Sequence, residues 1–289
     1  MDLLQTYIDH IPEYLLSWKL FAALAVCLAL EAVYFVHARP LLSVGLAQDF
    51  VFSICKRWLF LPLMLANAAI YRAAYEHLLP PGEWQIARTW PGWQQFVVGY
   101  VAGDFMVYAT HVMMHKVGIL WHFHAMHHSQ PNLNPLTTDR THFVEDVFED
   151  AVQYLPLAVL GVSFPTWVGV RAFNWCWAHL VHANVRWNLG PLGRVLVSPQ
   201  YHRMHHSIDP RHHDRNFAGR FVLWDWLFGT LNPERDLYPE TGLGDAAYPL
   251  ETSARPGALI RQTLRLYLHP FRAILREHPV FLRLARTRS

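Results

Sequence analysis

Histidines recur at helical spacing in separate parts of this chain, and any fold it adopts must bring them together. Fourteen of its nineteen histidines lie between residues 111 and 213. In HVMMH the second histidine comes four residues after the first, and in HAMHH and HRMHH the later two come three and four residues after the first, so they share one helix face. The histidines of these motifs are His111, His115, His124, His127, His128, His202, His205 and His206. HLVHAN adds His182, with His179 three residues before it.

Packing this many imidazoles together would bury many ring nitrogens that need partners, and protonating them would create strong repulsion. A metal centre resolves both problems. One metal takes about four to six ligands, so this number of histidines predicts two ions that share a site. Nitrogen ligands suit zinc, iron, copper and nickel, and the spacing alone does not exclude zinc.

Apolar segments indicate an all-α integral membrane protein. The chain is 53% hydrophobic and 16% charged, which is too apolar for an ordinary soluble domain. The candidate membrane segments are 15–36, 58–71, 96–112 and 147–182. The last is too long for one crossing and contains Gly161 and Pro165, so it predicts two antiparallel helices. We expect about four or five membrane helices, each needing roughly 20 apolar residues. The alternative is a large soluble helical core.

Basic residues predict how the chain is oriented. Arg39, Lys56 and Arg57 lie between the first two apolar segments, which places the histidine motifs on the cytoplasmic face. Fifteen of the 24 basic residues follow residue 183, and this charge suits anionic lipid headgroups without invoking nucleic acid. Residues 250–289 mix leucines and arginines, which predicts amphipathic helices on the inner membrane surface over a helical cytosolic cap.

Three segments of the chain resemble the fatty acid hydroxylase and sterol desaturase superfamily. They are DFMVYATHVMMHKVGILWHFHAMHHS from Asp104, HANVRWNLGPLGRVLVSPQYHRMHHS from His182 and DRNFAGRFVLWDWLFGT from Asp214. The resemblance covers about residues 96–230 of a single domain, 1–289. It implies an integral membrane enzyme with a histidine-bound di-iron centre that uses dioxygen to oxidise an unactivated C–H bond in a lipid. Some relatives have a histidine where this chain has Ala178, and His122 is extra, so the role of His179 stays open.

Acidic residues near the motifs are candidates for orienting the ligands. Asp104 lies seven residues before His111 in an apolar helix, which marks it as a functional candidate, with a helix contact as the alternative. Glu145 and Asp214 are further candidates. Asp225 is expected to fix a turn. Aromatic residues such as Trp121 would line a path for substrate from the lipid, or act as ordinary interfacial anchors.

The leading function is hydroxylation of a membrane lipid, fatty-acyl or sterol-like. Desaturation by the same site and a zinc-dependent membrane hydrolase are the alternatives. The expected cofactors are two iron ions, with dioxygen as co-substrate and zinc as the competing metal. No dinucleotide or flavin fingerprint is present in the sequence, so electrons would come from a separate electron-transfer protein. We expect the protein in a bacterial inner membrane or the endoplasmic reticulum. Its oligomeric state stays open.

Overall fold

A computed structural model describes residues 18–38, 40, 43–56, 86–162, 164–245, 248–250 and 252–277. Within these residues the fold is all helical, as predicted, and the extended segments form isolated bridges rather than strands. The longer helices are α2 (Trp18–Tyr34), α3 (Val44–Ile54), α5 (Gly92–Lys116), α6 (Gly118–His128), α7 (Phe143–Leu160), α8 (Phe164–His182) and α11 (Pro256–Glu277). The shorter ones are η2 (Ile86–Thr89), η3 (Pro135–Asp139), η4 (Gly190–Arg194), α9 (Pro199–His205), η5 (Pro210–His212) and α10 (Leu223–Leu227).

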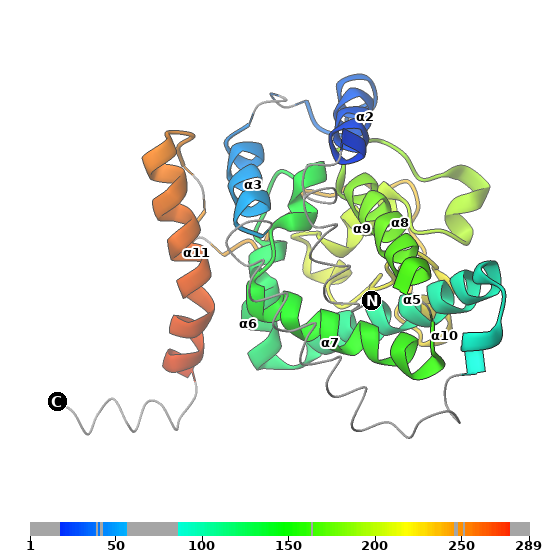
Figure 1. The fold of residues 1–289 in the computed structure, drawn as a ribbon. Helices are drawn as coiled ribbons and strands as arrows, with labels where there is room; N and C mark the ends of the chain where they lie inside the picture. Colours follow the sequence, from blue (N-terminus) through cyan, green and yellow to red (C-terminus); the bar gives the residue numbers. More distant parts are fainter. Residues whose placement is uncertain are drawn as a thin grey trace, which may run out of the picture.

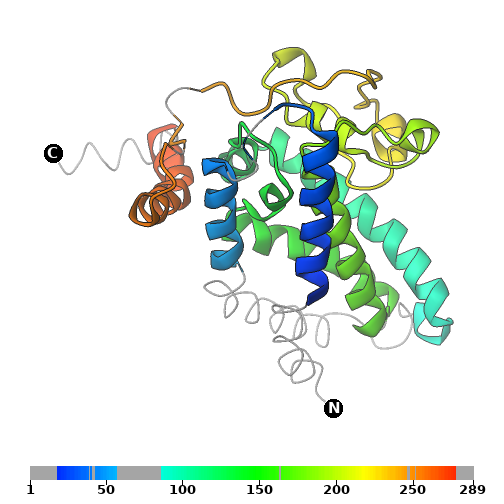
Figure 2. The same cartoon turned by 90° about the horizontal axis from the view of Figure 1, so that it is seen from above.

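The long helices lie together, and the loop-rich segment between α8 and α11 lies at one end of them. Figure 1 shows the order of the helices, and Figure 2 shows α2, α3 and α8 running side by side. The segment between α8 and α11, coloured yellow to orange, covers one end of these helices in Figure 2. The described residues between α8 and α11, which we call the cap, are thus made largely of loops and short helices and lie at one end of the longer helices.

Helix α5 is the one described helix that is long and apolar enough to cross a membrane. Shorter apolar helices occur at Leu24–Tyr34, inside the first predicted segment, and at Val44–Ile54. The predicted segment 58–71 lies outside the described residues, as do residues 278–289 at the end of the predicted amphipathic region. A count of four or five membrane helices therefore stays a prediction.

The predicted break within residues 147–182 is present. Helix α7 ends at Leu160, and Gly161 follows with a φ of 77°, a conformation that glycine adopts without a steric penalty. Helix α8 begins at Phe164, next to Pro165, which is favoured in the first turn of a helix. Both α7 and α8 pack against α5. Helix α5 thus packs against the two long helices that follow the first two histidine motifs along the chain.

Helix α6 follows α5 after a single residue, so two histidine motifs lie on either side of a sharp turn. Val117 is extended, with φ of −100° and ψ of 108°, and it caps both helices. The peptide N–H of Val117 still donates to the carbonyl of Met113 at 2.9 Å. Because the chain bends at this one residue, α5 and α6 are in contact, and the rings of His111 and His115 lie against those of His124 and His128.

A buried ion pair joins α3 to the loop after η3. Asp49 Oδ1 accepts from Arg140 Nη1 at 3.0 Å, and both side chains are fully buried. The other carboxylate oxygen, Oδ2, accepts at 2.8–2.9 Å from the side chains of Gln130, Asn134 and Thr137. Such a pair is tolerated in a core because every charged atom has a partner.

Arg140 also holds the end of α6 in place. Its Nε donates to the carbonyl of Met126 and to Ser129 Oγ, both at 3.1 Å. These bonds fix the last turn of α6, where His127 and His128 lie. The buried charge pair therefore determines where two candidate ligands are placed.

Replacing Asp49 with alanine would leave the Arg140 guanidinium buried without its carboxylate. We expect Asp49→Ala to reduce the free energy of unfolding by about 3–5 kcal/mol. The measurement is the thermal unfolding midpoint of the purified protein in detergent. The matched control is Asp209→Ala, which removes an exposed pair with Arg211 and should leave the midpoint nearly unchanged. Equal midpoints for the two variants would contradict this account.

Candidate metal centre

Four helices bring nine histidines into two neighbouring groups. Helix α5 supplies two of them, α6 three, α8 one and α9 with the residue after it three. Group one consists of His111, His115, His124, His128 and His205, and group two of His127, His182, His202 and His206. Within each group the ligand nitrogens all lie within 4.8 Å of one another. These are the nine histidines that the sequence motifs predicted as ligands.

The two HxxHH motifs each contribute to both groups. In HAMHH, His124 and His128 belong to group one and His127 to group two. In HRMHH the first and last histidines belong to group two and the middle one, His205, to group one. On a helix, residues four apart are nearly aligned, whereas the residue three along points to the other side of that line. One motif can therefore face two sites at once.

His128 lies at the centre of group one. Its Nε2 atom is 3.1 Å from His115 Nε2, 3.2 Å from His124 Nε2 and 3.1 Å from His205 Nε2. In group two, His182 and His202 share the central position, and His202 Nε2 also lies 3.1 Å from His206 Nε2. His182 Nε2 is 3.1 Å from His127 Nε2 and 2.9 Å from His202 Nε2. In both groups, Nε2 atoms from different helices thus converge on one point.

Hydrogen bonds at Nδ1 fix the orientation of three of these rings. His111 Nδ1 donates to the carbonyl of Phe217 at 2.7 Å, and His205 Nδ1 donates to that of Arg215 at 2.8 Å. In group two, His182 Nδ1 donates to the carbonyl of Ala178 at 2.7 Å. A ring that donates from Nδ1 carries its lone pair on Nε2, and this is the usual arrangement around a metal.

Glu145 fixes the orientation of a fourth ring, that of His124. Its Oε1 lies 2.6 Å from Nδ1 of His124, and both side chains are buried. A carboxylate in this position fixes the ring and makes its other nitrogen a better ligand. Sequence reasoning named Glu145 as a candidate, and the structure brings it into contact with a group one histidine from 21 residues away.

The donor set fits metal ions. Two Nε2 lone pairs that face each other at 2.9–3.2 Å repel unless a proton or a metal ion lies between them. Nitrogen ligands lie about 2.0–2.1 Å from an ion such as zinc, so adjacent ligands of one ion are separated by about 3 Å. His111 Nε2 is buried without a hydrogen-bond partner, as expected of a ligand atom.

Burial keeps the imidazoles neutral. It lowers the pKa of His124 to about 3. Burial, followed by the neighbouring imidazoles, holds the pKa of His202 and His206 well below the usual range. A neutral imidazole is the form that binds a metal, so the site does not need to lose protons first.

The two groups adjoin, as a dinuclear site requires. The rings of His128 in group one and His206 in group two are stacked with centroids 4.3 Å apart. The ring of His127 lies 4.7 Å from that of His206 and 5.4 Å from that of His124. Two ions held by these groups would therefore be neighbours.

Asp104 does not contact an imidazole among the described residues. Its carboxylate accepts from the peptide N–H of Phe221 at 3.0 Å, from Trp224 Nε1 at 2.8 Å and from Arg220 Nη1 at 3.5 Å. It thus attaches the segment that follows Phe217 to α5. This interaction corresponds to the helix contact that the sequence left open as an alternative.

Asp214 lies at the edge of group one. It is exposed, bonds to Lys116 Nζ at 2.6 Å and has Oδ1 3.8 Å from His115 Nδ1, which is too long for a hydrogen bond. His179, whose role stayed open, is in neither group. Its Nδ1 donates to the carbonyl of Trp175 at 2.8 Å.

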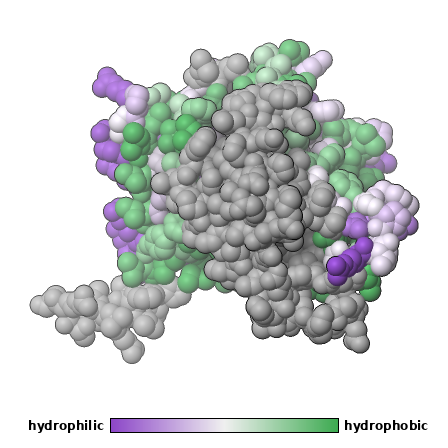
Figure 3. Space-filling view, in the orientation of Figure 1, coloured by the Kyte–Doolittle hydropathy of each residue, from purple (hydrophilic) through white to green (hydrophobic). Residues whose placement is uncertain are grey.

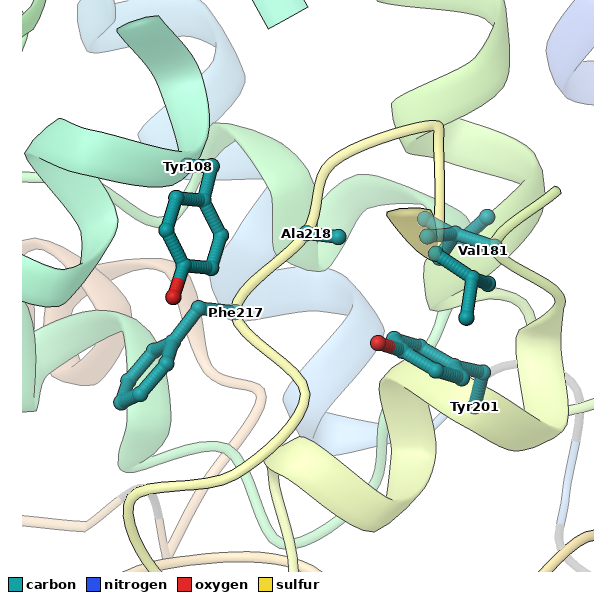
Figure 4. Packing of buried hydrophobic residues seen from close by; sticks show 7 residues of the cluster. Tyr108, Val181, Tyr201, Phe217 and Ala218 are labelled. Atoms are coloured by element: carbon teal, nitrogen blue, oxygen red, sulfur yellow. The ribbon is translucent and has the colours of Figure 1, made fainter. Parts of the chain in front are cut away.

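Asp225 supports group one from a distance, which sequence reasoning did not foresee. It accepts from the peptide N–H groups of Phe217 and Ala218 at 2.9 and 2.6 Å and from Tyr201 OH at 2.6 Å. Figure 4 shows Phe217 and Ala218 on the extended segment between Tyr108 and Tyr201. Asp225 also accepts from Thr230 Oγ1 at 2.6 Å, so it fixes the turn that follows it, as predicted. The extended segment that it holds presents the Phe217 carbonyl to His111.

Comparison with known proteins adds independent evidence. Residues 96–230 match the family model described as fatty acid hydroxylase. An ornithine lipid hydroxylase from Rhizobium tropici is 33% identical over 183 residues, covering 63% of this chain and 54% of that protein. An alkylglycerol monooxygenase from Xenopus tropicalis is 35% identical over 153 residues, covering 53% of this chain and 32% of that protein.

A methylsterol monooxygenase from Arabidopsis thaliana is 25% identical over 174 residues, covering 59% of this chain and 63% of that protein. The chain thus spans about half the length of the first of these relatives and about a third of the second. No solved structure matches it significantly. The matched region contains both histidine groups, so the resemblance to the fatty acid hydroxylase family predicted from the motifs is confirmed over residues 96–230.

Proposed function

We propose that this protein is a membrane lipid monooxygenase whose nine clustered histidines bind two iron ions. The observation that carries the proposal is the pair of adjoining groups of buried, converging Nε2 atoms within the region that matches the family. The relatives named above are hydroxylases and monooxygenases, which favours a redox metal over zinc. Two bound irons would supply the electron-transfer chemistry that dioxygen needs in order to react with a C–H bond.

The overall reaction inserts one oxygen atom of O₂ into a C–H bond and releases the other as water. It consumes two electrons and two protons, which a separate electron-transfer protein and the solvent would supply. The chain's own part is to hold the metals and place the lipid beside them. The relatives' names include an ornithine lipid, an alkylglycerol and a methylsterol, and we infer a membrane lipid as the substrate class here.

Four acidic residues would act as positioning groups. Glu145 would hold the ring of His124, and Asp225 would hold the Phe217 carbonyl that His111 uses. Asp104 would act one step further away through Phe221 and Trp224. Asp214, paired with Lys116, would place negative charge at the edge of group one.

Trp121 supports an approach to group one from the lipid side. Its ring centroid lies 4.9 Å from that of His115 and 5.5 Å from that of His128. Phe123, another aromatic residue of the same motif, packs against Phe271 instead. We infer that α5 spans the membrane within a set of about four or five membrane helices, with the metal centre on the cytoplasmic side of a bacterial inner membrane or the endoplasmic reticulum.

Removing a central ligand should empty the site, whereas removing a buried histidine outside it should not. We expect wild-type protein from iron-supplied cells to contain about two irons per chain and His128→Ala to lose at least one of them. His179→Ala is the matched control and should keep both. The measurement is metal content by mass spectrometry. Two tightly bound zinc ions with full activity in the absence of oxygen would overturn the iron proposal.

Neutralising Glu145 tests its positioning role. We expect Glu145→Gln to leave the protein folded and to weaken metal binding roughly 10 to 100-fold, because the amide, unlike the carboxyl of Glu145, cannot become an anionic partner for the ring of His124. Competition with a chelator of known affinity measures the change. Glu240→Gln is a suitable control, since Glu240 pairs with His37, outside both groups. If Glu145→Gln leaves the metal affinity unchanged, Glu145 contributes to packing only.

The product identifies the reaction. Lipid extracts of cells expressing the wild type should contain a species with one more oxygen atom than its parent, absent from cells expressing His124→Ala and absent without oxygen. Loss of two hydrogens would indicate desaturation instead. Release of an alkyl chain as an aldehyde would indicate hydroxylation beside an ether oxygen. Identical lipid profiles in several hosts supplied with iron would contradict a membrane lipid as substrate.

A further inference from the structure

Helix α11 has one face that belongs to the core. The buried residues of this face are Leu259, Thr263, Leu266, Pro270 and Ile274. They pack on α3 and α6, and Gln48 of α3 bonds to Thr263 and to the carbonyl of Leu259. The position of α11 on the body of the protein is thus fixed by specific contacts.

A second, exposed face of α11 is also apolar. Its residues are Ile260, Leu264, Leu268, Phe271 and Leu275, and between 40% and 57% of each is exposed. Their spacing of three and four places them in a single stripe along the whole helix. A stripe of large apolar side chains on an exposed helix marks a contact with another apolar phase or partner.

Arginines line the same helix beside this stripe. The exposed ones are Arg261, Arg265, Arg272 and Arg276. With 3.6 residues per turn they fall on the sector adjacent to the stripe and away from the buried face. Figure 3 shows hydrophilic and hydrophobic residues next to each other along the edge where α11 runs. Three of these arginines and His269 also line a surface pocket together with Asp245 and Glu277. The charge of this sector suits an anionic partner.

The direction of α11 differs from that of the apolar helices. Figure 1 shows α11 lengthwise and α2 nearly end-on, whereas Figure 2 shows α2 and α3 lengthwise and α11 nearly end-on. Helix α11 therefore runs crosswise to them. If the apolar helices stand in a bilayer, as the proposed function requires, α11 extends parallel to its surface.

We propose that α11 lies in the headgroup region of an anionic bilayer, with the apolar stripe inserted between lipids and the arginines on lipid phosphates. This arrangement is the one that an amphipathic helix with a basic polar face adopts at a membrane surface. A second copy of the chain fits less well, because two rows of arginines would meet and repel each other. The inference rests on the membrane location within the proposed function and adds the lipid charge and the residues that select it.

The docked helix would also stabilise the metal centre. Phe271 of the stripe has its ring centroid 5.4 Å from that of Phe123 in α6. His142, three residues before Glu145, donates from Nε2 to the carbonyl of Tyr267 at 3.1 Å. The helix held at the membrane surface thus contacts both segments that position His124.

Depth-dependent quenching on the full chain tests the inference. A fluorophore is attached at Leu264→Cys in a background without Cys27, Cys55 and Cys176, and the protein is reconstituted in phosphatidylglycerol vesicles with bromine high on the acyl chains. We expect quenching several-fold stronger than for the same label at Asp236→Cys, an exposed position on the cap. Equal quenching at the two positions would overturn the proposal.

Reversing the charge of two arginines and testing for a dimer supply the remaining outcomes. Adding Arg265→Glu and Arg272→Glu to the labelled Leu264→Cys protein should reduce its quenching in phosphatidylglycerol to the weaker level found in phosphatidylcholine. Quenching that is equal in both lipids and unchanged by these substitutions would overturn the role of anionic lipid. A disulfide-linked dimer of the unlabelled Leu264→Cys protein under mild chemical oxidation, together with no quenching of the labelled protein, would assign the stripe to a second copy. Iron content of the same samples tests the proposed function separately.

Discussion

The hydrogen bonds at Nδ1 of the clustered histidines are the interaction on which the rest of this structure depends. Four of the nine rings bond through Nδ1 to a carbonyl or carboxylate outside the cluster, which leaves Nε2 to point inward; they are His111, His124, His182 and His205. The Nδ1 atoms of His127, His202 and His206 are buried without such a partner. Inward-pointing lone pairs repel each other and lose contact with water, so the cluster by itself costs free energy. Under the proposed function, bound metal ions would offset this cost.

Buried charges elsewhere in the fold supply that support. Asp225 and Asp104 hold the two ends of the segment around Phe217 and Phe221, and this segment provides carbonyls for His111 and His205. The Asp49–Arg140 pair holds the last turn of α6. Each of these carboxylates is buried and satisfied by several donors, so each has one favourable arrangement. The candidate ligands are therefore held in fixed positions.

Helix α5 joins the two requirements of the proposed chemistry. Its first part is apolar enough for a lipid environment, and its last turns carry His111 and His115. Under the proposed function, a lipid in the bilayer would reach the metal centre along the same helix that carries two of its ligands. The crosswise direction of α11 would then place the centre at the level of the membrane surface, where an apolar substrate and a water-soluble electron donor could both approach.

Sequence alone indicated the eight histidines of the three motifs, because a spacing of three and four on a helix is a local property that tertiary contacts do not alter. It also predicted the helical class, the break at Gly161 and the resemblance to the fatty acid hydroxylase family over residues 96–230, since the motifs are ordered and specific. Sequence did not determine how the nine histidines divide. Whether His127 faces the ring of His124 or that of His182 depends on how α6 is rotated against α8, and that rotation is set by contacts such as Met126 with Arg140.

The supporting residues were likewise decided by the tertiary structure. Glu145 meets His124 across 21 residues, and the Phe217 carbonyl meets His111 across 106, so no spacing rule links them. The exclusion of His179 has the same origin. It lies three residues before His182 on α8, a spacing that suits a shared face, yet its ring donates to the carbonyl of Trp175, its Nε2 lies 3.8 Å from Asp139 Oδ2, and it belongs to neither group. Local periodicity fixes which side chains are neighbours on a helix, whereas packing between helices fixes which of them share a site.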